Sequence, residues 1–191
     1  MATSSSSTAD SPQPFDGARI VIVMGVSASG KTVVGEEIAR RLHAPFLDGD
    51  DYHPTANVKK MSAGIPLTDE DRWPWLESLA RALHEAADRK GVAVGACSAL
   101  RRAYRDFLTE KAEEPIVFVY LDGSYELIDS RIKARKGHFM PESLLRSQFA
   151  TLEPPAPDEN AIAVPIVEAP DKIAALALKQ LSYLKAFKRG Q

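Results

Sequence analysis

The fold of this chain is decided by one stretch near its N-terminus, IVIVMGVSASGKT at residues 20–32. Its first five residues form a continuous apolar and mostly β-branched run, which is typical of a strand buried on both faces of a parallel sheet. The other eight fit the pattern G-x-x-x-x-G-K-[ST]. Residues 31–43 place Val34, Ile38 and Leu42 four positions apart, which predicts an amphipathic helix. A glycine-rich loop between a buried strand and a helix is the setting that separates a true phosphate-binding loop, or P-loop, from a chance match.

The P-loop predicts a nucleoside triphosphate site. Its glycines let successive backbone N–H groups converge on a phosphate, and the following helix adds the positive end of its dipole. We expect Lys31 to reach the β- and γ-phosphates and to act in catalysis, and the Thr32 hydroxyl to ligate Mg²⁺. An ordinary glycine turn before a helix is the alternative, and it leaves the Lys-Thr pair unexplained. The loop residues expected to bind ATP are Gly25, Val26, Ser27, Ala28, Ser29, Gly30, Lys31 and Thr32.

Strand and helix patterns alternate along the rest of the chain. We expect further strands at 45–47, 92–94, 116–121 and 163–167, and further helices at 75–88, 125–134 and 171–187. Repeated strand–helix units predict a three-layer α/β/α domain with a doubly wound parallel sheet. The length of 191 residues fits one such domain, at 18–191, after a Ser-rich segment, 1–17, that we predict to be a disordered tail.

Composition excludes several classes of function. The chain has 24 basic and 26 acidic residues, so no overall positive field attracts nucleic acid or an anionic membrane. Cys97 is the only cysteine, which excludes an internal disulfide and a thiolate zinc site, and we expect it in the core. No apolar run approaches the roughly 20 residues that span a bilayer. A cytoplasmic protein is therefore expected, although the Ser-rich tail leaves organelle targeting open.

A P-loop alone does not name the reaction, because ATPases, GTPases, transporters and kinases share it. A guanine-specific GTPase is expected to carry an N-K-x-D segment, which the chain does not supply near residues 121–123. Large ATPase modules need more chain than is present. The sequence therefore favours a kinase.

Two carboxylates, Asp48 and Asp50, follow the second predicted strand. Ligands of open α/β sheets bind at the carboxyl ends of strands, so the position suits catalysis. Phosphoryl transfer needs a carboxylate that orients the accepting hydroxyl and one that organises Mg²⁺. The third strand ends without an acid, so both tasks fall to these residues, and the spacing does not say which does which. Acids that cap the next turn are the alternative.

Basic residues indicate where the acceptor binds. An irregular insertion at about 51–74 supplies His53, Lys60 and Arg72, and Arg72 has the planar fork that suits a carboxylate. After the third strand, Arg101 and Arg105 stand at i, i+4 and are expected to face the cleft together, with Arg102 pointing outward. Solvated surface charges are the alternative for each of them.

A second basic segment, at about 131–155, predicts a lid over the triphosphate, with Arg131 and Arg135 as its charged residues. A solvated helix face is the alternative. The turn that ends at Pro170 is predicted to border the adenine, with a lid arginine on the other face of the base.

Several longer motifs go beyond a generic kinase. They are the P-loop itself, DGDDYHP at 48–54, NVKKM at 57–61, GIPLTDEDRWPWL at 64–76, CSALRRAYRD at 97–106, KGHFMP at 136–141 and SQFATLEPP at 147–155. With these motifs the chain resembles the gluconokinases of the shikimate-kinase-like P-loop group, from Val23 to its end.

The resemblance implies an ATP:D-gluconate 6-phosphotransferase that forms 6-phospho-D-gluconate, depends on Mg²⁺, contains a five-stranded parallel sheet and often forms a homodimer. It also implies that Asp50 orients the hydroxyl and takes its proton, while Asp48 acts through Mg²⁺ or its waters. Two alternatives stay open. One is a kinase for another acceptor, such as shikimate, adenylylsulfate or a nucleotide, and the other is a nucleotide-binding regulatory module without turnover.

Overall fold

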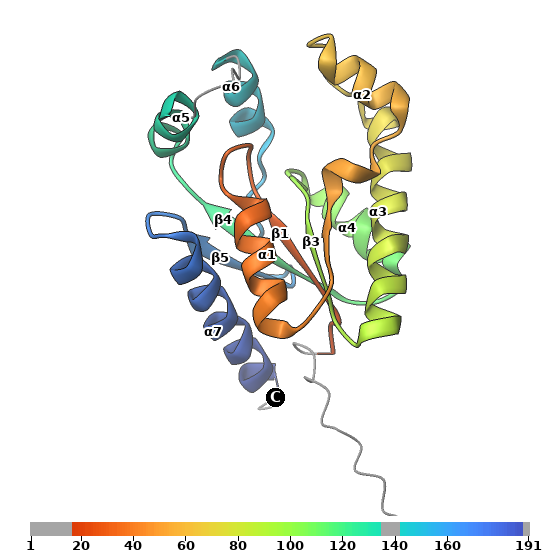
Figure 1. The fold of residues 1–191 in the computed structure, drawn as a ribbon, viewed down its shortest axis with the longest axis vertical. Helices are drawn as coiled ribbons and strands as arrows, with labels where there is room; N and C mark the ends of the chain where they lie inside the picture. The colour runs from red at the N-terminus through yellow and green to blue at the C-terminus, as the bar shows by residue number, and fades with distance from the viewer. Residues whose placement is uncertain (1–16, 135–141, 189–191) are drawn as a thin grey trace, which may run out of the picture.

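The computed structural model describes residues 17–134 and 142–188, arranged as Figure 1 shows. The predicted tail therefore lies outside the described residues except for Gly17, as does Arg135. Five strands form one sheet in the order β2-β3-β1-β4-β5, and every neighbouring pair is parallel. The strands are β1 (Ile20–Met24), β2 (Phe46–Asp48), β3 (Ala93–Ala96), β4 (Ile116–Asp122) and β5 (Ala161–Pro165). The predicted doubly wound α/β fold is confirmed.

Helices cover both faces of this sheet (Figure 1). α1 packs against α7 on one face, and α3 packs against α4 on the other. The helices are α1 (Lys31–Leu42), α2 (Thr55–Ser62), α3 (Asp69–Lys90), α4 (Arg102–Ala112), α5 (Tyr125–Ala134), α6 (Glu142–Thr151) and α7 (Pro170–Lys188), with a 3₁₀ turn η1 (Gly49–Tyr52) after β2. None of the helices within the described ranges is long and apolar enough to cross a membrane.

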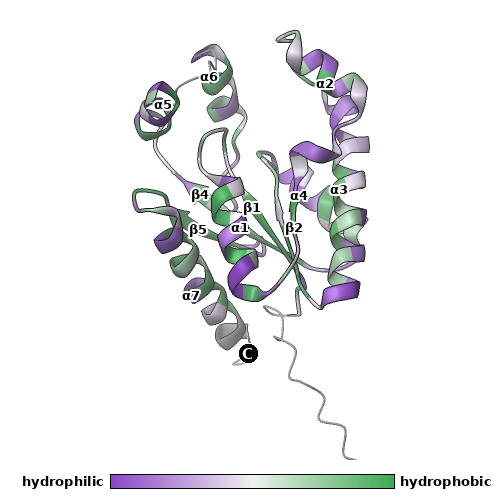
Figure 2. Ribbon diagram, viewed as in Figure 1, coloured by the Kyte–Doolittle hydropathy of each residue, from purple (hydrophilic) through white to green (hydrophobic). Residues whose placement is uncertain are grey.

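The central strand explains why the first sequence motif decides the fold. Every residue of β1 is fully buried. Val21 and Val23 belong to the core on the α1 and α7 side, and Ile20 and Ile22 to the core on the α3 and α4 side. An apolar run without alternation is what a strand covered on both faces requires, and Figure 2 shows the central strands in hydrophobic colours. Because β1 is central, the P-loop emerges in the middle of the carboxyl edge of the sheet.

Some predicted boundaries are wrong. α3 begins at Asp69, six residues before the predicted start at 75, and α2 lies inside the segment expected to be irregular. Thr68 and Asp71 form a reciprocal capping box that starts α3 early, and Pro74 is accommodated inside the helix. β5 begins two residues before the predicted start at 163, because its pairing with β4 matches Ala161 to Phe118.

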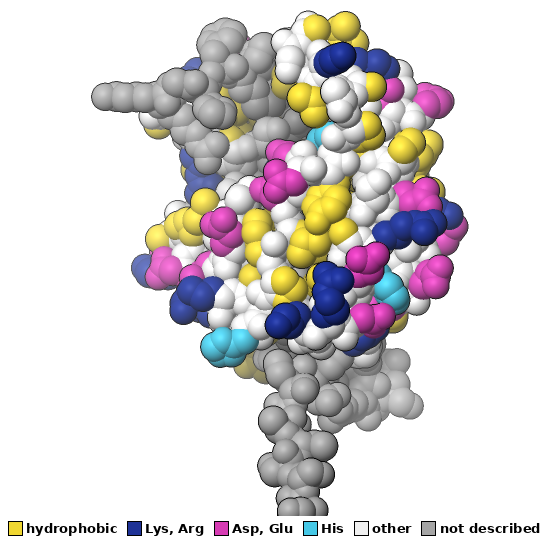
Figure 3. Space-filling model, turned by 45° about the vertical axis from the view of Figure 1, so that its right-hand side comes forward, with side chains coloured by type: hydrophobic (Ala, Val, Ile, Leu, Met, Phe, Trp, Pro, Cys, Tyr) yellow, Lys and Arg dark blue, Asp and Glu magenta, His cyan; other side chains and the backbone are white. Residues whose placement is uncertain are grey.

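The surface and the cysteine agree with the analysis of composition. Figure 3 shows basic and acidic side chains interspersed over the face that it draws. Cys97 is 3% exposed in the core, and burial raises the pKa of its thiol to about 12. Its place in the core is thereby confirmed.

Candidate active site

The P-loop connects β1 to α1 with a strained backbone. Gly25 and Gly30 have φ values of 142° and 99°, and Ala28 has a φ of 62°. Gly30 is the N-cap of α1, so the loop ends where the helix dipole favours an anion. Lys31 curls back over the loop and its Nζ donates to the carbonyl oxygen of Val26 at 3.0 Å. The loop has the form that a triphosphate site needs.

Asp48 joins the end of β2 to the P-loop. Its Oδ2 accepts a hydrogen bond from Thr32 Oγ1 at 2.8 Å, and its Oδ1 accepts one from the backbone of Asp50 at 3.1 Å. The alternative that these acids cap the next turn is therefore correct for Oδ1 of Asp48, because Asp48 is the N-cap of η1. The other oxygen meets the hydroxyl that was expected to ligate a metal ion. A carboxylate and a hydroxyl are hard oxygen donors of the kind that Mg²⁺ prefers, so the two residues fit that ion.

Asp50 lies on η1 with an exposed side chain, and two close contacts fix this turn. Only glycine fits at position 49, because a Cβ there would stand 2.5 Å from the carbonyl oxygen of Ala96. On the other side, Trp75 Nε1 donates to the carbonyl oxygen of Gly49 at 2.6 Å. Trp75 lies on a helix, as the sequence predicts, but its contact with Gly49 was not predicted.

His53 packs flat on Trp75, with ring centroids 4.0 Å apart and an angle of 19° between the planes. Burial lowers the pKa of His53 below its ordinary value, and the charge of Arg72 adds to this effect while that of Asp50 opposes it. The imidazole is therefore held in its neutral form more strongly than a solvated histidine.

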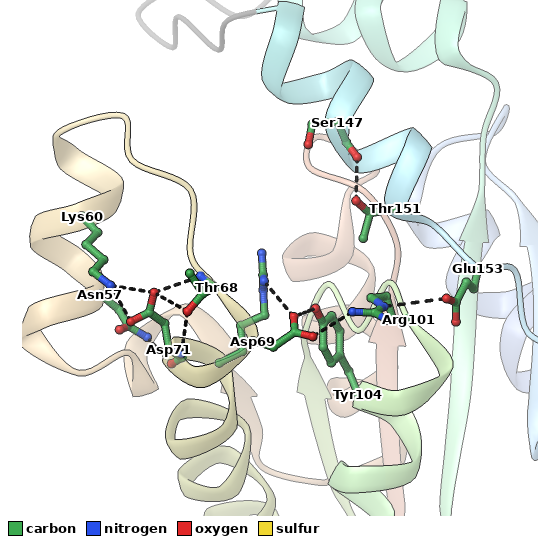
Figure 4. Close-up of polar contacts among 11 residues, drawn as sticks. Asn57, Lys60, Thr68, Asp69, Asp71, Arg101, Tyr104, Ser147, Thr151 and Glu153 are labelled. Atoms are coloured by element: carbon green, nitrogen blue, oxygen red, sulfur yellow. Dashed lines mark hydrogen bonds and ion pairs between the residues drawn. The ribbon is translucent and has the colours of Figure 1, made fainter.

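Asp69 gathers three donors at the start of α3, as Figure 4 shows for Arg101 and Tyr104. Its carboxylate accepts from Tyr104 Oη at 2.6 Å, from Arg101 Nη1 at 2.8 Å and from Arg72 Nη1 at 3.4 Å. Each guanidinium also stands 5.6 Å from the centroid of the Tyr104 ring. The hydrogen bond from Tyr104, helped by both arginine charges, lowers the pKa of Asp69. The structure thus brings together Arg72 and Arg101, but through two residues that the sequence analysis did not single out.

Lys60 is engaged in the insertion itself. Its Nζ lies 2.6 Å from Asp71 Oδ1, and this ion pair lowers the pKa of Asp71 together with the contacts from Thr68. Asn57 Nδ2 also donates to the carbonyl oxygen of Asp71 at 2.8 Å. Lys60 therefore ties α2 to the capping box of α3, as Figure 4 shows.

The expectation that Arg105 faces the cleft beside Arg101 is wrong. Arg105 is 1% exposed, and its Nε and Nη2 bind the Glu159 carboxylate at 2.6 and 2.9 Å. Its Nη1 donates to the carbonyl oxygen of Ala99 at 3.0 Å. Arg101 is the N-cap of α4 and has an extended backbone, so the helical i, i+4 rule does not apply to this pair. Arg105 lines a separate pocket of about 280 Å³ with Glu159, so the prediction that it binds the acceptor is wrong. Arg102 is exposed, as expected.

Arg131 bridges the P-loop and the last strand. From α5, its Nη1 donates to the carbonyl oxygen of Ser29 at 3.3 Å, and its Nη2 donates to that of Ile166. Pro170 begins α7 four residues after Ile166. The arginine predicted for the lid therefore lies between the loop and the turn predicted to border the adenine, while Arg135 and the motif at 136–141 lie outside the described residues.

Gln148 on α6 is a further residue that the sequence analysis did not single out. Its Oε1 accepts from the backbone N–H of Ser27 at 2.7 Å, and its Nε2 donates to Ser27 Oγ at 2.9 Å. The two residues are 121 positions apart, so no spacing rule could have paired them.

Known proteins resemble this chain over most of its length. Residues 27–173 match the family described as shikimate kinase. The thermosensitive gluconokinase of Escherichia coli (strain K12) is 50% identical over 141 residues, which cover 74% of this chain and 75% of the relative. The gluconokinase of Gluconobacter oxydans (strain 621H) is 48% identical, covering 81% of this chain and 86% of its own.

A solved structure agrees with these relatives. The crystal structure of a gluconokinase from Sinorhizobium meliloti 1021 superimposes with a TM-score of 0.82 at 44% identity, and the match covers 94% of this chain and 99% of that one. A shikimate kinase from Aquifex aeolicus, at 19% identity and a TM-score of 0.56, shares the fold. With its P-loop and its carboxylate-bearing second strand, the chain belongs to the shikimate kinase family and, within it, to the gluconokinases.

Proposed function

We propose that this protein phosphorylates D-gluconate with ATP and forms 6-phospho-D-gluconate. The relatives named gluconokinase, 48–50% identical over most of the chain, support the choice of acceptor. The observation in the structure that carries the proposal is the contact of Thr32 with Asp48, because it joins the triphosphate loop to the acid-bearing end of β2, where Asp50 follows.

The donor side consists of the P-loop and Arg131. The loop N–H groups and the α1 dipole bind the phosphates, and Lys31 supplies a point charge. Thr32 and Asp48 would hold Mg²⁺, which, when bound, would neutralise charge on the transferred phosphoryl group. Arg131 covers the loop beside Ser29 and stabilises charge that develops during transfer.

The acceptor side begins at Asp50. We assign to it the orientation of the gluconate 6-hydroxyl and the acceptance of its proton, which fits an exposed carboxylate on a turn held by Trp75. Asp48 is committed to Thr32 and to the cap of η1, so it is the less suitable base.

The carboxylate of gluconate binds Arg72 and Arg101 in this proposal. Two guanidinium groups share Asp69, and Arg101 Nε also lies 3.8 Å from Glu153 Oε1, so it is the two planar forks, and not a net positive charge, that suit an anionic acceptor. Charge-assisted hydrogen bonds to a planar fork are the strong contacts that distinguish an acid from a neutral sugar. Lys60 and His53 lie in the same insertion, with Lys60 held by Asp71.

A coupled assay of ADP release tests the proposal against its alternatives. The purified protein is given ATP and Mg²⁺ with gluconate, glucose, shikimate, adenylylsulfate or a nucleoside monophosphate. Gluconate should support the highest kcat/KM by far. Faster turnover of another acceptor would show a different kinase, and ADP release that no acceptor stimulates would favour a regulatory module.

We also propose a cytoplasmic location and a homodimer, the latter on the family resemblance alone. Light scattering coupled to size exclusion measures the assembly. Fluorescent fusions with and without residues 1–16 test whether the Ser-rich segment changes the location.

A further inference from the structure

The contact between α6 and the P-loop consists of two hydrogen bonds, one accepted and one donated by the same side chain. Gln148 accepts from the backbone of Ser27 and donates to its hydroxyl, at 2.7 and 2.9 Å. If the Gln148 amide were flipped, its NH₂ group would face the Ser27 N–H, and two donors would meet. The two hydrogen bonds therefore fix the orientation of the Gln148 side chain. Both residues are partly buried, where an unpaired backbone donor is costly.

This contact holds the P-loop at a sensitive point. Ser27 directly precedes Ala28, whose left-handed backbone turns the chain back toward α1. The Ser27 N–H is directed to α6, and the Ser29 N–H is directed to Val26 at 3.3 Å. Gln148 therefore fixes the direction of the Ser27 N–H, one of the donors of the loop.

The same helix is also anchored to α5 and to the segment before α4. Leu145 of α6 is 1% exposed, and Phe149 packs edge-on against Tyr125 of α5. Just after α6, the backbone N–H of Glu153 donates to the carbonyl oxygen of Leu100 at 2.8 Å, next to Arg101. α6 is thus tied to the donor loop through Gln148 and to the start of α4 through Glu153.

We propose that Gln148 is a positioning residue for phosphoryl transfer: through Ser27 it seats α6 on the P-loop, so that the γ-phosphoryl group faces the acceptor hydroxyl and water is kept away. The inference rests on the proposed kinase function and adds a residue to it. Holding reactants in line and excluding water both depend on such supporting contacts.

Three variants separate this role from simple stability. Gln148→Ala removes both hydrogen bonds. Gln148→Glu keeps an acceptor for the Ser27 N–H and one for its hydroxyl, but adds a negative charge beside the phosphates. Arg146→Ala is the matched control, because Arg146 is exposed on the same helix, and its contacts with Glu142 of α6 and with the Tyr125 ring of α5 do not involve the P-loop.

Gln148→Ala should lower kcat for gluconate about ten- to a hundredfold, the range that a small misplacement can cause, with less than about a threefold change in the KM for ATP. The ratio of ADP formed to gluconate phosphorylated should rise above one, because α6 no longer excludes water. Gln148→Glu should be impaired at pH 8 and regain activity relative to wild type toward about pH 5.5, where a glutamate beside phosphates becomes protonated. Arg146→Ala should behave as wild type.

Two results would overturn the inference. One is wild-type kcat and wild-type coupling in Gln148→Ala. The other is a loss of activity that is explained by a lower melting temperature of the variant, so that activity returns to the wild-type level when the assay is run well below that temperature. Failure of the proposed function is distinguishable, because it would appear in the wild-type protein as a lack of gluconate phosphorylation, whereas failure of this inference appears as an unchanged variant.

Discussion

Thr32 Oγ1 donates a hydrogen bond to Asp48 Oδ2 at 2.8 Å, although β3 lies between β2, which ends at Asp48, and β1, which leads into the P-loop. The contact spans 16 positions of sequence and links the end of the P-loop to the end of β2. The two neighbouring acids therefore differ: Asp48 is turned to the loop, and Asp50, exposed on η1, is the residue that we propose for the acceptor.

The roles of these acids predict different kinetic defects. Asp50→Asn should lower kcat about a hundredfold or more, the scale of general-base and positioning losses, with little change in ATP binding. Asp48→Asn should instead raise the Mg²⁺ concentration needed for half-maximal rate. Titrations of Mg²⁺ and ATP on both variants check this. An Asp50→Asn enzyme with intact turnover and a raised Mg²⁺ requirement would exchange the two roles.

Lys31→Ala should abolish transfer without unfolding the protein. Lys31 begins α1 with an Nζ that reaches back to the Val26 carbonyl, so its removal opens no core cavity. Its point charge on the phosphates is lost, however. Circular dichroism and thermal melting should match wild type, while ADP release falls to background. Near-normal turnover in a normally folded variant would exclude this role.

The sheet was predictable from sequence, and the cluster of Arg72, Arg101 and Tyr104 around Asp69 was not. β1 and β4 are buried on both faces, and such strands appear as continuous apolar runs rich in β-branched residues. The Thr32–Asp48 pair was also within reach, because a P-loop and an acid at a strand end must meet at the carboxyl edge. Asp69 and Tyr104 were missed because their contact forms only when α3 packs on α4.

The error at Arg105 has a local cause. The side chains of Arg101 and Arg105 share a face only if both lie within one helix, and α4 begins one residue after Arg101. Helix boundaries are the least certain part of a prediction from sequence. Here the helix begins one residue later than the i, i+4 argument requires, so Arg105 is buried in an ion pair while Arg101 stays partly exposed.

Arg105 and Glu159 should therefore matter for stability. Their side chains are 1% and 7% exposed, and removing one partner of a buried pair costs about 3–5 kcal/mol. Arg105→Ala should lower the free energy of unfolding by this order at pH 7, without a selective loss of gluconate affinity. Arg81→Ala, which breaks the exposed pair with Glu77, is the control and should change it by less than about 0.5 kcal/mol.

The same pair predicts a dependence on acid. The hydrogen bonds from Arg105 lower the pKa of Glu159 in the folded protein. The contribution of this pair to the free energy of unfolding is therefore complete above the pKa of Glu159 in the unfolded chain, about 4.3. It is lost as the pH falls through the lower pKa of Glu159 in the folded protein. Denaturant unfolding between pH 7 and pH 3 should show a shallower decline for Glu159→Gln than for wild type. Parallel declines would mean that the pair does not contribute to acid sensitivity.

Selectivity for an acid over a neutral polyol should depend on Arg72 and Arg101. Both contact Asp69 and flank the Tyr104 ring, so one carboxylate can meet two guanidinium groups. Losing a charge-assisted contact costs about 1.5–3 kcal/mol, roughly ten- to 150-fold in kcat/KM. Arg72→Ala and Arg101→Ala should each lower kcat/KM for gluconate in this range and leave the KM for ATP nearly unchanged.

A lysine at either position should rescue these variants poorly, because an ammonium cannot reproduce the planar fork. Arg102→Ala is the matched control, since Arg102 adjoins Arg101 but is exposed and paired with Asp158. The decisive measurement is the ratio of kcat/KM for gluconate to that for an uncharged polyol of the same length. That ratio should collapse in the variant that removes the true carboxylate contact. If both alanine variants keep the wild-type ratio, the carboxylate binds elsewhere, and Lys60 and His53 become the residues to substitute next.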